Sequence, residues 1–371
     1  MDSIRRILTV LSHLSRLLLQ ASCSRAPSPR RAPSPRLALP ALLLVLALFL
    51  PGAAPARAAE DGPDFTLDDL RSAAVRVEAQ VPHGAATAGI LGSRRSGNGV
   101  VIGEDGLVLT IGYLILEAAT VDVVDHSGRR LPAEILAYDF NTGFGLLRAL
   151  VPLQARPLAL GEAGDLKTGD KALVLGHESA GGLAPATVTA RRIFTGSWEY
   201  LLDSAIYTRP PFPEFGGAGL VDKAGRLVGI GSLTVRNAGP DAADDMPAPG
   251  NVFVPIDLLA PILADLKAAR RGAGPRHPWL GMNTVDFGPG LLVQRVVPDG
   301  PAAKAGIAAG NVVLALQGEP FEDQAEFYRR VWALGEPGVD VDLQVLDGRK
   351  VRDLRLRSAD RYDFLKLDPS L

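Results

Sequence analysis

The stretch GNGVVIGEDGLVLTIGYLIL, residues Gly97–Leu116, decides the fold class. Two apolar runs, Gly99–Ile102 and Leu107–Ile111, flank the dipeptide Asp105-Gly106. An Asp-Gly pair between β-prone runs is a strong hairpin signal, because the tight turns that join such strands need positive φ angles. We therefore predict an antiparallel hairpin here, with both turn residues at positive φ.

Short apolar runs separated by turn signals continue from this hairpin to Val254. Their spacing of roughly 8–12 residues is typical of an all-β region. A pair of small antiparallel barrels would close that many strands. The further strand candidates are Val121–Val124, Leu131–Tyr138, Phe144–Leu150, Ala172–Gly176, Ala186–Ile193, Tyr200–Tyr207, Gly219–Val221 and Leu227–Leu233.

Helical patterns flank the strand-rich region. Asp64–Ala74 reads as a short helix with Thr66 as its N-cap and an acidic first turn, and Val75–Glu78 then alternates as a strand. Ile256–Arg271 carries apolar residues at helical spacing, which predicts a helix before the Gly274-Pro275 linker.

The N-terminus indicates export. An apolar run, Leu37–Leu50, follows three arginines and is short for a membrane span, and Ala56–Ala58 reads as an A-x-A cleavage site. We expect residues 1–58 to be a signal peptide with an extended n-region, which leaves no integral membrane segment after cleavage. The alternative is an uncleaved membrane anchor at residues 37–50.

The composition of the mature chain excludes several kinds of site. Residues 59–371 hold 31 basic and 40 acidic residues, a net charge of −9, which argues against nucleic acid as a partner. The only cysteine, Cys23, lies in the leader, so no disulfide or catalytic thiol is expected. No His or Cys cluster has metal-ligand spacing and no Gly-rich loop leads from a strand into a helix, so we expect no metal and no cofactor.

The mature chain resembles the HtrA/Deg family of trypsin-like serine proteases in the order of its segments. Besides residues 97–116, the family's strand patterns match Asp139–Arg148, Asp203–Tyr207, Gly225–Ile230 and Gly250–Pro255. The resemblance implies an all-β, trypsin-like double β-barrel over residues 59–255. A helix and linker (256–276), a PDZ domain of α+β type (277–358) and a tail (359–371) would follow.

The PDZ resemblance rests on Gly290–Val297, Pro301–Gly306 and Asn311–Gln317, followed by a helix over Phe321–Leu334 and a hairpin at Asp347-Gly348. In such domains a peptide C-terminus adds as a strand, and its carboxylate meets backbone N–H groups of a loop. We call Trp279–Met282 the carboxylate loop. The groove would lie between the strand near Leu291–Val293 and the helix carrying Phe327 and Val331, although these apolar residues also fit an ordinary core. The predicted peptide-binding residues are Leu280, Gly281, Met282, Leu291, Val293, Phe327 and Val331.

The resemblance also locates the three positions of a catalytic triad. The base falls on Tyr113, the orienting acid on Gly143 and the nucleophile on Phe215. A tyrosine has a pKa near 10, and a glycine and a phenylalanine supply neither a carboxylate nor a hydroxyl. His177 and Ser179 are too close in sequence to replace the missing pair, so no catalytic residue is predicted.

The resulting hypothesis is an exported HtrA-like pseudoprotease of the periplasm or another extracytoplasmic compartment. It would bind protein C-termini or unfolded segments as a scaffold, regulator or holdase in envelope protein quality control. One alternative is an active serine endopeptidase of the same family. Another is a non-catalytic subunit that joins an active paralogue. The family's N-terminal segment makes trimer contacts, and here Phe65 would either do so in a homo-trimer or close a local cluster.

Overall fold

The computed structural model describes residues 65–178, 181–240, 247–269 and 274–365. The predicted leader, its cleavage site near Ala58 and the anchor at residues 37–50 lie outside the described residues. Within the described ranges, no helix has the length and apolar character needed to cross a membrane.

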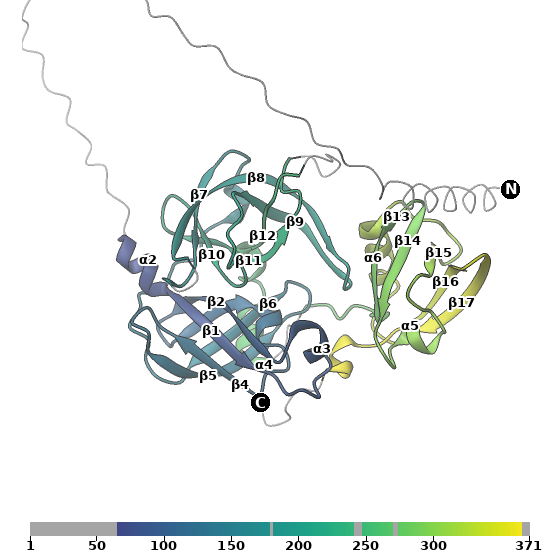
Figure 1. Ribbon diagram of the computed structural model, residues 1–371, viewed down its shortest axis with the longest axis horizontal. Helices are drawn as coiled ribbons and strands as arrows, with labels where there is room; N and C mark the ends of the chain where they lie inside the picture. Colours follow the sequence, from purple (N-terminus) through teal and green to yellow (C-terminus); the bar gives the residue numbers. More distant parts are fainter. Residues whose placement is uncertain (1–64, 179–180, 241–246, 270–273, 366–371) are drawn as a thin grey trace, which may run out of the picture. The chain divides into compact units, whose positions relative to one another are not determined.

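Twelve strands form two closed antiparallel barrels (Figure 1), as the strand spacing predicted. The first barrel has the order β1-β2-β3-β6-β5-β4 and the second has the order β10-β11-β12-β9-β8-β7. The strands of the first are β1 (Ala74–Gln80), β2 (Arg94–Gly103), β3 (Leu107–Ile111), β4 (Thr120–Val124), β5 (Arg130–Tyr138) and β6 (Phe144–Ala149). Those of the second are β7 (Lys171–Leu175), β8 (Leu183–Gly196), β9 (Tyr200–Arg209), β10 (Gly219–Val221), β11 (Leu227–Val235) and β12 (Gly250–Pro255).

The predicted β2–β3 hairpin is present, but its turn is longer than expected. Gly103 pairs with Leu107, so the loop has three residues, and only the last of them, Gly106, has a positive φ (+74°). Three-residue hairpin loops place their final residue in the left-handed region, where glycine is favoured. The prediction of positive φ at Asp105 was therefore wrong, while the need for glycine at position 106 holds.

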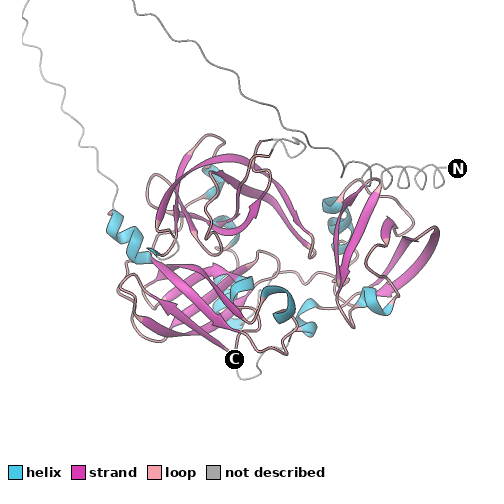
Figure 2. Cartoon of the chain, viewed as in Figure 1, coloured by secondary structure: helices cyan, strands magenta, loops and turns pink. Residues whose placement is uncertain are grey.

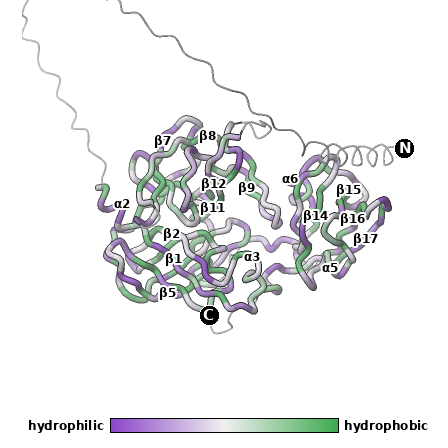
Figure 3. Tube along the Cα trace, in the orientation of Figure 1, coloured by the Kyte–Doolittle hydropathy of each residue, from purple (hydrophilic) through white to green (hydrophobic). Residues whose placement is uncertain are grey.

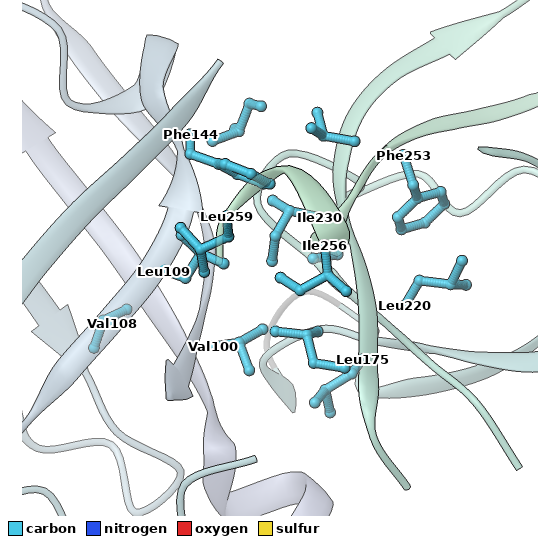
Figure 4. Close-up of a cluster of buried hydrophobic side chains, with 14 of the residues drawn as sticks. Val100, Val108, Leu109, Phe144, Leu175, Leu220, Ile230, Phe253, Ile256 and Leu259 are labelled. Atoms are coloured by element: carbon cyan, nitrogen blue, oxygen red, sulfur yellow. The ribbon is translucent and has the colours of Figure 1, made fainter. Parts of the chain in front are cut away.

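One hydrophobic core joins the two barrels. In Figure 4, Leu109 and Phe144 of the first barrel lie close to Ile230 of the second, with Leu259 and Ile256 in the same cluster. All five side chains are almost fully buried. Figure 3 shows hydrophobic positions recurring along the strands of both barrels, in keeping with this shared core.

The helices around the barrels are short. α2 (Leu67–Ala73) has the predicted Thr66 cap, which forms a capping box with Asp69. The predicted continuous helix over Ile256–Arg271 is interrupted: a 3-10 turn, η4 (Ile256–Leu258), precedes α4 (Leu263–Ala269). Pro261 lies in the break, where its ring and missing N–H disfavour a continuous helix. The remaining short helices here are α3 (Ala88–Leu91), η1 (Gly112–Leu114) and η2 (Ala163–Asp165).

The C-terminal domain is a five-stranded antiparallel sheet with two helices (Figure 2). The strand order follows the chain, β13-β14-β15-β16-β17. The elements are β13 (Met282–Phe287), β14 (Gly290–Val296), α5 (Pro301–Lys304), β15 (Val312–Leu316), α6 (Gln324–Trp332), β16 (Asp340–Asp347), β17 (Lys350–Arg357) and η5 (Arg361–Phe364). The helix expected at Phe321–Leu334 and the hairpin expected at Asp347-Gly348 are both present.

Candidate functional site

The three triad positions inferred from the sequence lie together between the barrels. The N–H of Gly112, next to Tyr113, donates to the Gly143 carbonyl at 2.7 Å. On the other side, a Cβ built on Gly216 would lie 2.7 Å from the Tyr113 hydroxyl oxygen, so the tyrosine packs against the residue that follows Phe215. The fold therefore brings the three positions close together, but their side chains provide no histidine base, no carboxylate and no serine hydroxyl.

Tyr113 is engaged as a hydrogen-bond donor. Its hydroxyl donates to the Ser232 carbonyl at 3.0 Å, on strand β11. Burial raises the pKa of the Tyr113 hydroxyl well above its usual value, because the phenolate would lose its hydration. The group consequently stays protonated at neutral pH and joins the two barrels instead of accepting a proton.

The backbone at Gly143 is one that glycine favours. Its φ is +80°, in the left-handed region, where a side chain costs about 1–2 kcal/mol. An added Cβ would also lie 3.2 Å from the hydroxyl oxygen of Tyr200, which donates to the Thr142 carbonyl at 2.6 Å. An aspartate is thus disfavoured here by both conformation and space.

The loop that carries Phe215 is held by two buried asparagines. Asn251 accepts from the N–H of Phe212 at 2.6 Å and donates to its carbonyl at 3.2 Å. The side-chain amide of Asn98 donates to the Glu214 carbonyl at 2.6 Å, and the backbone N–H of Asn98 donates to the Gly216 carbonyl at 2.7 Å. The loop therefore has a defined shape without a hydroxyl at Phe215.

The four histidines in the described residues have different surroundings. His177 is buried, and its Nε2 contacts the Asp125 carbonyl at 3.0 Å. His277 stacks on Trp332 with ring centroids 4.4 Å apart, and burial lowers the pKa of its imidazole. His83 and His126 are exposed. In the part of the chain that the structure describes, no group of three or more His, Cys, Asp or Glu side chains is arranged to hold a metal ion.

The carboxylate loop of the C-terminal domain is occupied by a side chain from the second barrel. Glu199, at the tip of the β8–β9 hairpin, accepts hydrogen bonds from three backbone N–H groups of this loop. The N···O distances are 2.9 Å from Leu280, 2.8 Å from Gly281 and 3.2 Å from Met282. The backbone N–H groups of this loop are therefore directed at a glutamate of the same chain.

The other four predicted peptide-binding residues lie in the core of the C-terminal domain. Leu291, Val293, Phe327 and Val331 are all at most 1 % exposed. Strand β14, which carries Leu291 and Val293, pairs with β13 on one edge and β15 on the other. Strand β14 therefore has no free edge for a peptide to join, so the position expected for the groove was wrong. Strand β13 is the last strand on this side of the sheet and has no partner strand on its outer edge within the domain.

The outer edge of β13 is where the hairpin tip lies. The Thr284 N–H donates to the Ser197 carbonyl at 2.9 Å, and the Tyr328 hydroxyl on α6 donates to the Gly196 carbonyl at 3.0 Å. Gln324, also on α6, donates to the Tyr328 hydroxyl at 2.9 Å. The sequence did not identify these contacts, because a short hairpin turn is ordinarily expected to be solvent-exposed.

Aromatic rings surround the hairpin tip. Trp198 stacks on Tyr200 with a centroid distance of 5.7 Å, and Trp332 stacks on Tyr328 at 5.8 Å. Trp279, at the start of the carboxylate loop, packs on Phe364 at 4.6 Å. Of these rings, Tyr200, Trp279 and Trp332 line a pocket. Glu199, Arg329 and Arg361 also line it.

Phe65 packs within its own chain. A Cβ built on Gly225 would lie 2.0 Å from the Phe65 ring, so the ring lies directly on that turn, and it belongs to the fringe of the barrel core. This is the local cluster that the sequence left open as the alternative to a trimer contact.

Comparison with known proteins agrees with this architecture. Residues 97–230 match the trypsin-like peptidase domain family and residues 278–357 match the PDZ domain family. The chain is 27% identical over 267 residues to the periplasmic pH-dependent serine endoprotease DegQ of Escherichia coli, and 28% identical over 310 residues to a probable periplasmic DegP-like serine endoprotease of Halomonas elongata. A solved structure titled HtrA-type protease AlgW with decapeptide is similar with a TM-score of 0.48 at 19% identity, covering 82% of this chain and 100% of that one.

The chain is thus similar to HtrA/Deg-type proteins, and the named relatives are serine endoproteases. The fold is a trypsin-like double β-barrel followed by a PDZ domain, as the sequence predicted. The alignments cover 68% and 77% of this chain but 57% and 61% of the two relatives, so the chain spans about three fifths of their length.

Proposed function

We propose that this protein is an exported HtrA-like pseudoprotease that binds peptide C-termini through its PDZ domain. The observation that carries the proposal is the set of side chains at the gathered triad positions: a hydrogen-bonded Tyr113, a left-handed Gly143 and an apolar Phe215. Acyl transfer needs a hydroxyl nucleophile, a base beside it and an orienting acid. None of these three residues supplies the group that its position requires: Tyr113 is no base, Gly143 no acid and Phe215 no nucleophile.

The oxyanion-binding geometry is also altered. In the family's G-N-S-G-G motif the first glycine and the serine provide backbone N–H groups to the developing oxyanion, and Pro213 stands at the position of that glycine. A proline has no N–H to donate. Losing one such donor costs about 10²–10³-fold in rate, so the loop would be a poor catalyst even with a serine.

Peptide binding is supported by the carboxylate loop. The loop presents three backbone N–H groups that converge on one carboxylate, which is how PDZ domains hold a peptide terminus. The relatives' periplasmic location and the A-x-A site in the leader support export and a role in envelope protein quality control, as scaffold, regulator or holdase. Residues 59–255 would form the inactive protease domain and residues 277–358 the PDZ domain.

The alternative is an active serine endopeptidase, which the relatives' names favour. A fluorophosphonate probe and casein hydrolysis distinguish the two, because the probe reacts only with an activated serine. We expect neither labelling nor turnover of the purified protein, with trypsin as the positive control. Labelling that maps to a serine of this chain would establish the alternative.

A third candidate is a non-catalytic subunit of an active protease. The barrel and PDZ domain would then assemble with a catalytic paralogue, and affinity purification from the native host would recover that protease in stoichiometric amount. A monodisperse species containing only this chain would argue for an independent binding protein.

A further inference from the structure

The β8–β9 hairpin presents to the PDZ domain the same groups that a peptide C-terminus presents. Glu199 supplies a carboxylate to the carboxylate loop, and the Ser197 carbonyl pairs with the N–H of Thr284 on β13. Leu201 adds an apolar side chain that packs against the PDZ core. Carboxylate capture, strand pairing and an apolar contact are the interactions by which such domains hold a peptide.

The conformation of Glu199 shows that this contact is maintained against a local preference. Gly196 pairs with Tyr200, so the hairpin has a three-residue loop, and Glu199 ends it with a φ of +59°. Glycine is favoured at this position, and the equivalent residue of the β2–β3 hairpin is Gly106. A left-handed conformation is unfavourable for a glutamate, and its interactions with the carboxylate loop offset this cost.

The hairpin tip is held on every side. The Glu199 residue is 8 % exposed, and its carboxylate has three N–H donors. The Arg361 guanidinium donates to the Trp198 carbonyl at 3.0 Å, and Asp203 forms an ion pair with Arg329 of α6. A peptide carboxylate has no access to the loop while this side chain is in place.

We propose that Glu199 is an internal ligand of the PDZ carboxylate loop, and that a peptide C-terminus binds only after displacing the β8–β9 hairpin tip. The inference rests on the proposed peptide-binding function and adds its regulation. Competing ligands are chains with a free carboxylate and an apolar last residue, because these reproduce the groups that the hairpin supplies. Binding then couples the PDZ domain to the second barrel, since the displaced hairpin belongs to that barrel.

The test uses the full mature chain and its variants Glu199→Gly and Glu199→Gln. The glycine variant removes the carboxylate and suits the left-handed turn, so it retains the hairpin. Glu104→Ala is the matched control, because it removes an exposed glutamate from the turn of the β2–β3 hairpin, which is not part of this contact. The probe is a fluorescein-labelled octapeptide pool with apolar residues randomised at its last three positions, used as free acid and as amide.

We expect Glu199→Gly to bind the free-acid pool at least about tenfold more tightly than the wild type. In the wild type only the molecules whose hairpin tip is undocked can bind peptide, and the apparent affinity falls in proportion to that fraction. Glu199→Gln should show a smaller gain, since its amide still offers one acceptor oxygen to the loop. Glu104→Ala should change affinity less than about twofold, because this exposed side chain lies outside the contact with the PDZ domain. Equal affinity of the wild type and Glu199→Gly would overturn the internal-ligand proposal while leaving peptide binding intact.

If neither the wild type nor any variant binds the pool, hydrogen–deuterium exchange over residues 278–284 tests the internal-ligand proposal separately. That result would count against the proposed peptide-binding function. If these amides are protected in the wild type and exchange at least about tenfold faster in Glu199→Gly, the internal ligand stands. Unprotected amides in the wild type would refute it.

Discussion

Raising the pH from about 5 to 7 is expected to weaken the contact between Glu199 and the carboxylate loop and so to increase peptide affinity. Burial raises the pKa of the Glu199 carboxyl from 4.5 to about 7. The N–H donors of Leu280, Met282 and Gly281 and the charge of Arg361 lower it, but they do not cancel the loss of hydration. The Tyr328 hydroxyl, which also faces Glu199, has its pKa raised by burial and remains neutral over this range.

The direction and size of the effect follow from this shift. When Glu199 is docked, its carboxyl holds a proton at pH values where the undocked group has already lost it. The contact is therefore at full strength below about pH 4.5, weakens by about 1.4 kcal/mol per pH unit above that, and levels off above about pH 7. Between about pH 4.5 and 7 the free energy of docking Glu199 on the loop changes by about 3 kcal/mol. From about pH 5 to 7 the docking equilibrium constant falls by at most about 100-fold.

The assay is a fluorescence-anisotropy titration of the free-acid peptide pool at half-unit pH steps. The wild type should bind more tightly as the pH rises and reach a plateau near pH 7, while Glu199→Gln should give a flat profile. This variant keeps His277, whose titration is the main competing source of pH dependence near this groove. A profile that Glu199→Gln leaves unchanged, or a wild-type affinity that falls as the pH rises, would refute the reasoning.

Three further outcomes are expected. The variant carrying Tyr113→His, Gly143→Asp and Phe215→Ser should fold with a lower melting temperature and show no fluorophosphonate labelling above the wild type, and robust casein turnover would show that the oxyanion loop is functional. Gly217→Ala should lower the free energy of unfolding by more than about 2 kcal/mol in a urea titration, because its Cβ would lie 1.9 Å from a backbone carbonyl of β2 and its φ is +74°; an unchanged midpoint would contradict this packing. Mass spectrometry of the exported protein should find a mature N-terminus next to Ala58, and a chain that keeps the leader in the membrane fraction would support the anchor instead.

The local elements were predictable because their signals are local. Asp105-Gly106 indicated the β2–β3 hairpin, and Thr66 indicated the start of α2. The break in the predicted helix between Leu258 and Leu263 also has a local cause, Pro261. The spacing of the apolar residues alone did not indicate this break. In each case a few neighbouring residues determine the backbone conformation.

The groove was not predictable from neighbouring residues. The strand with a free edge depends on the order of the whole sheet, and that order leaves β13 outermost and places Leu291 and Val293 in the interior. Glu199 meets a loop 81 to 83 residues further along the chain, and a lone glutamate in a turn has no sequence signal for such a contact. The closest available indication is a charged residue at the hairpin position where glycine is favoured.

The aromatic rings around the hairpin tip give this protein an intrinsic optical reporter. The chain has three tryptophans, Trp198, Trp279 and Trp332, and all three lie on the hairpin tip, the carboxylate loop or the helix that borders the groove. Their indole emission senses solvent and ring stacking, so withdrawal of the hairpin would shift it to longer wavelength. The folded barrels contribute no other indole to the signal. Unlabelled protein would therefore report release of the hairpin on the millisecond scale of a stopped-flow experiment.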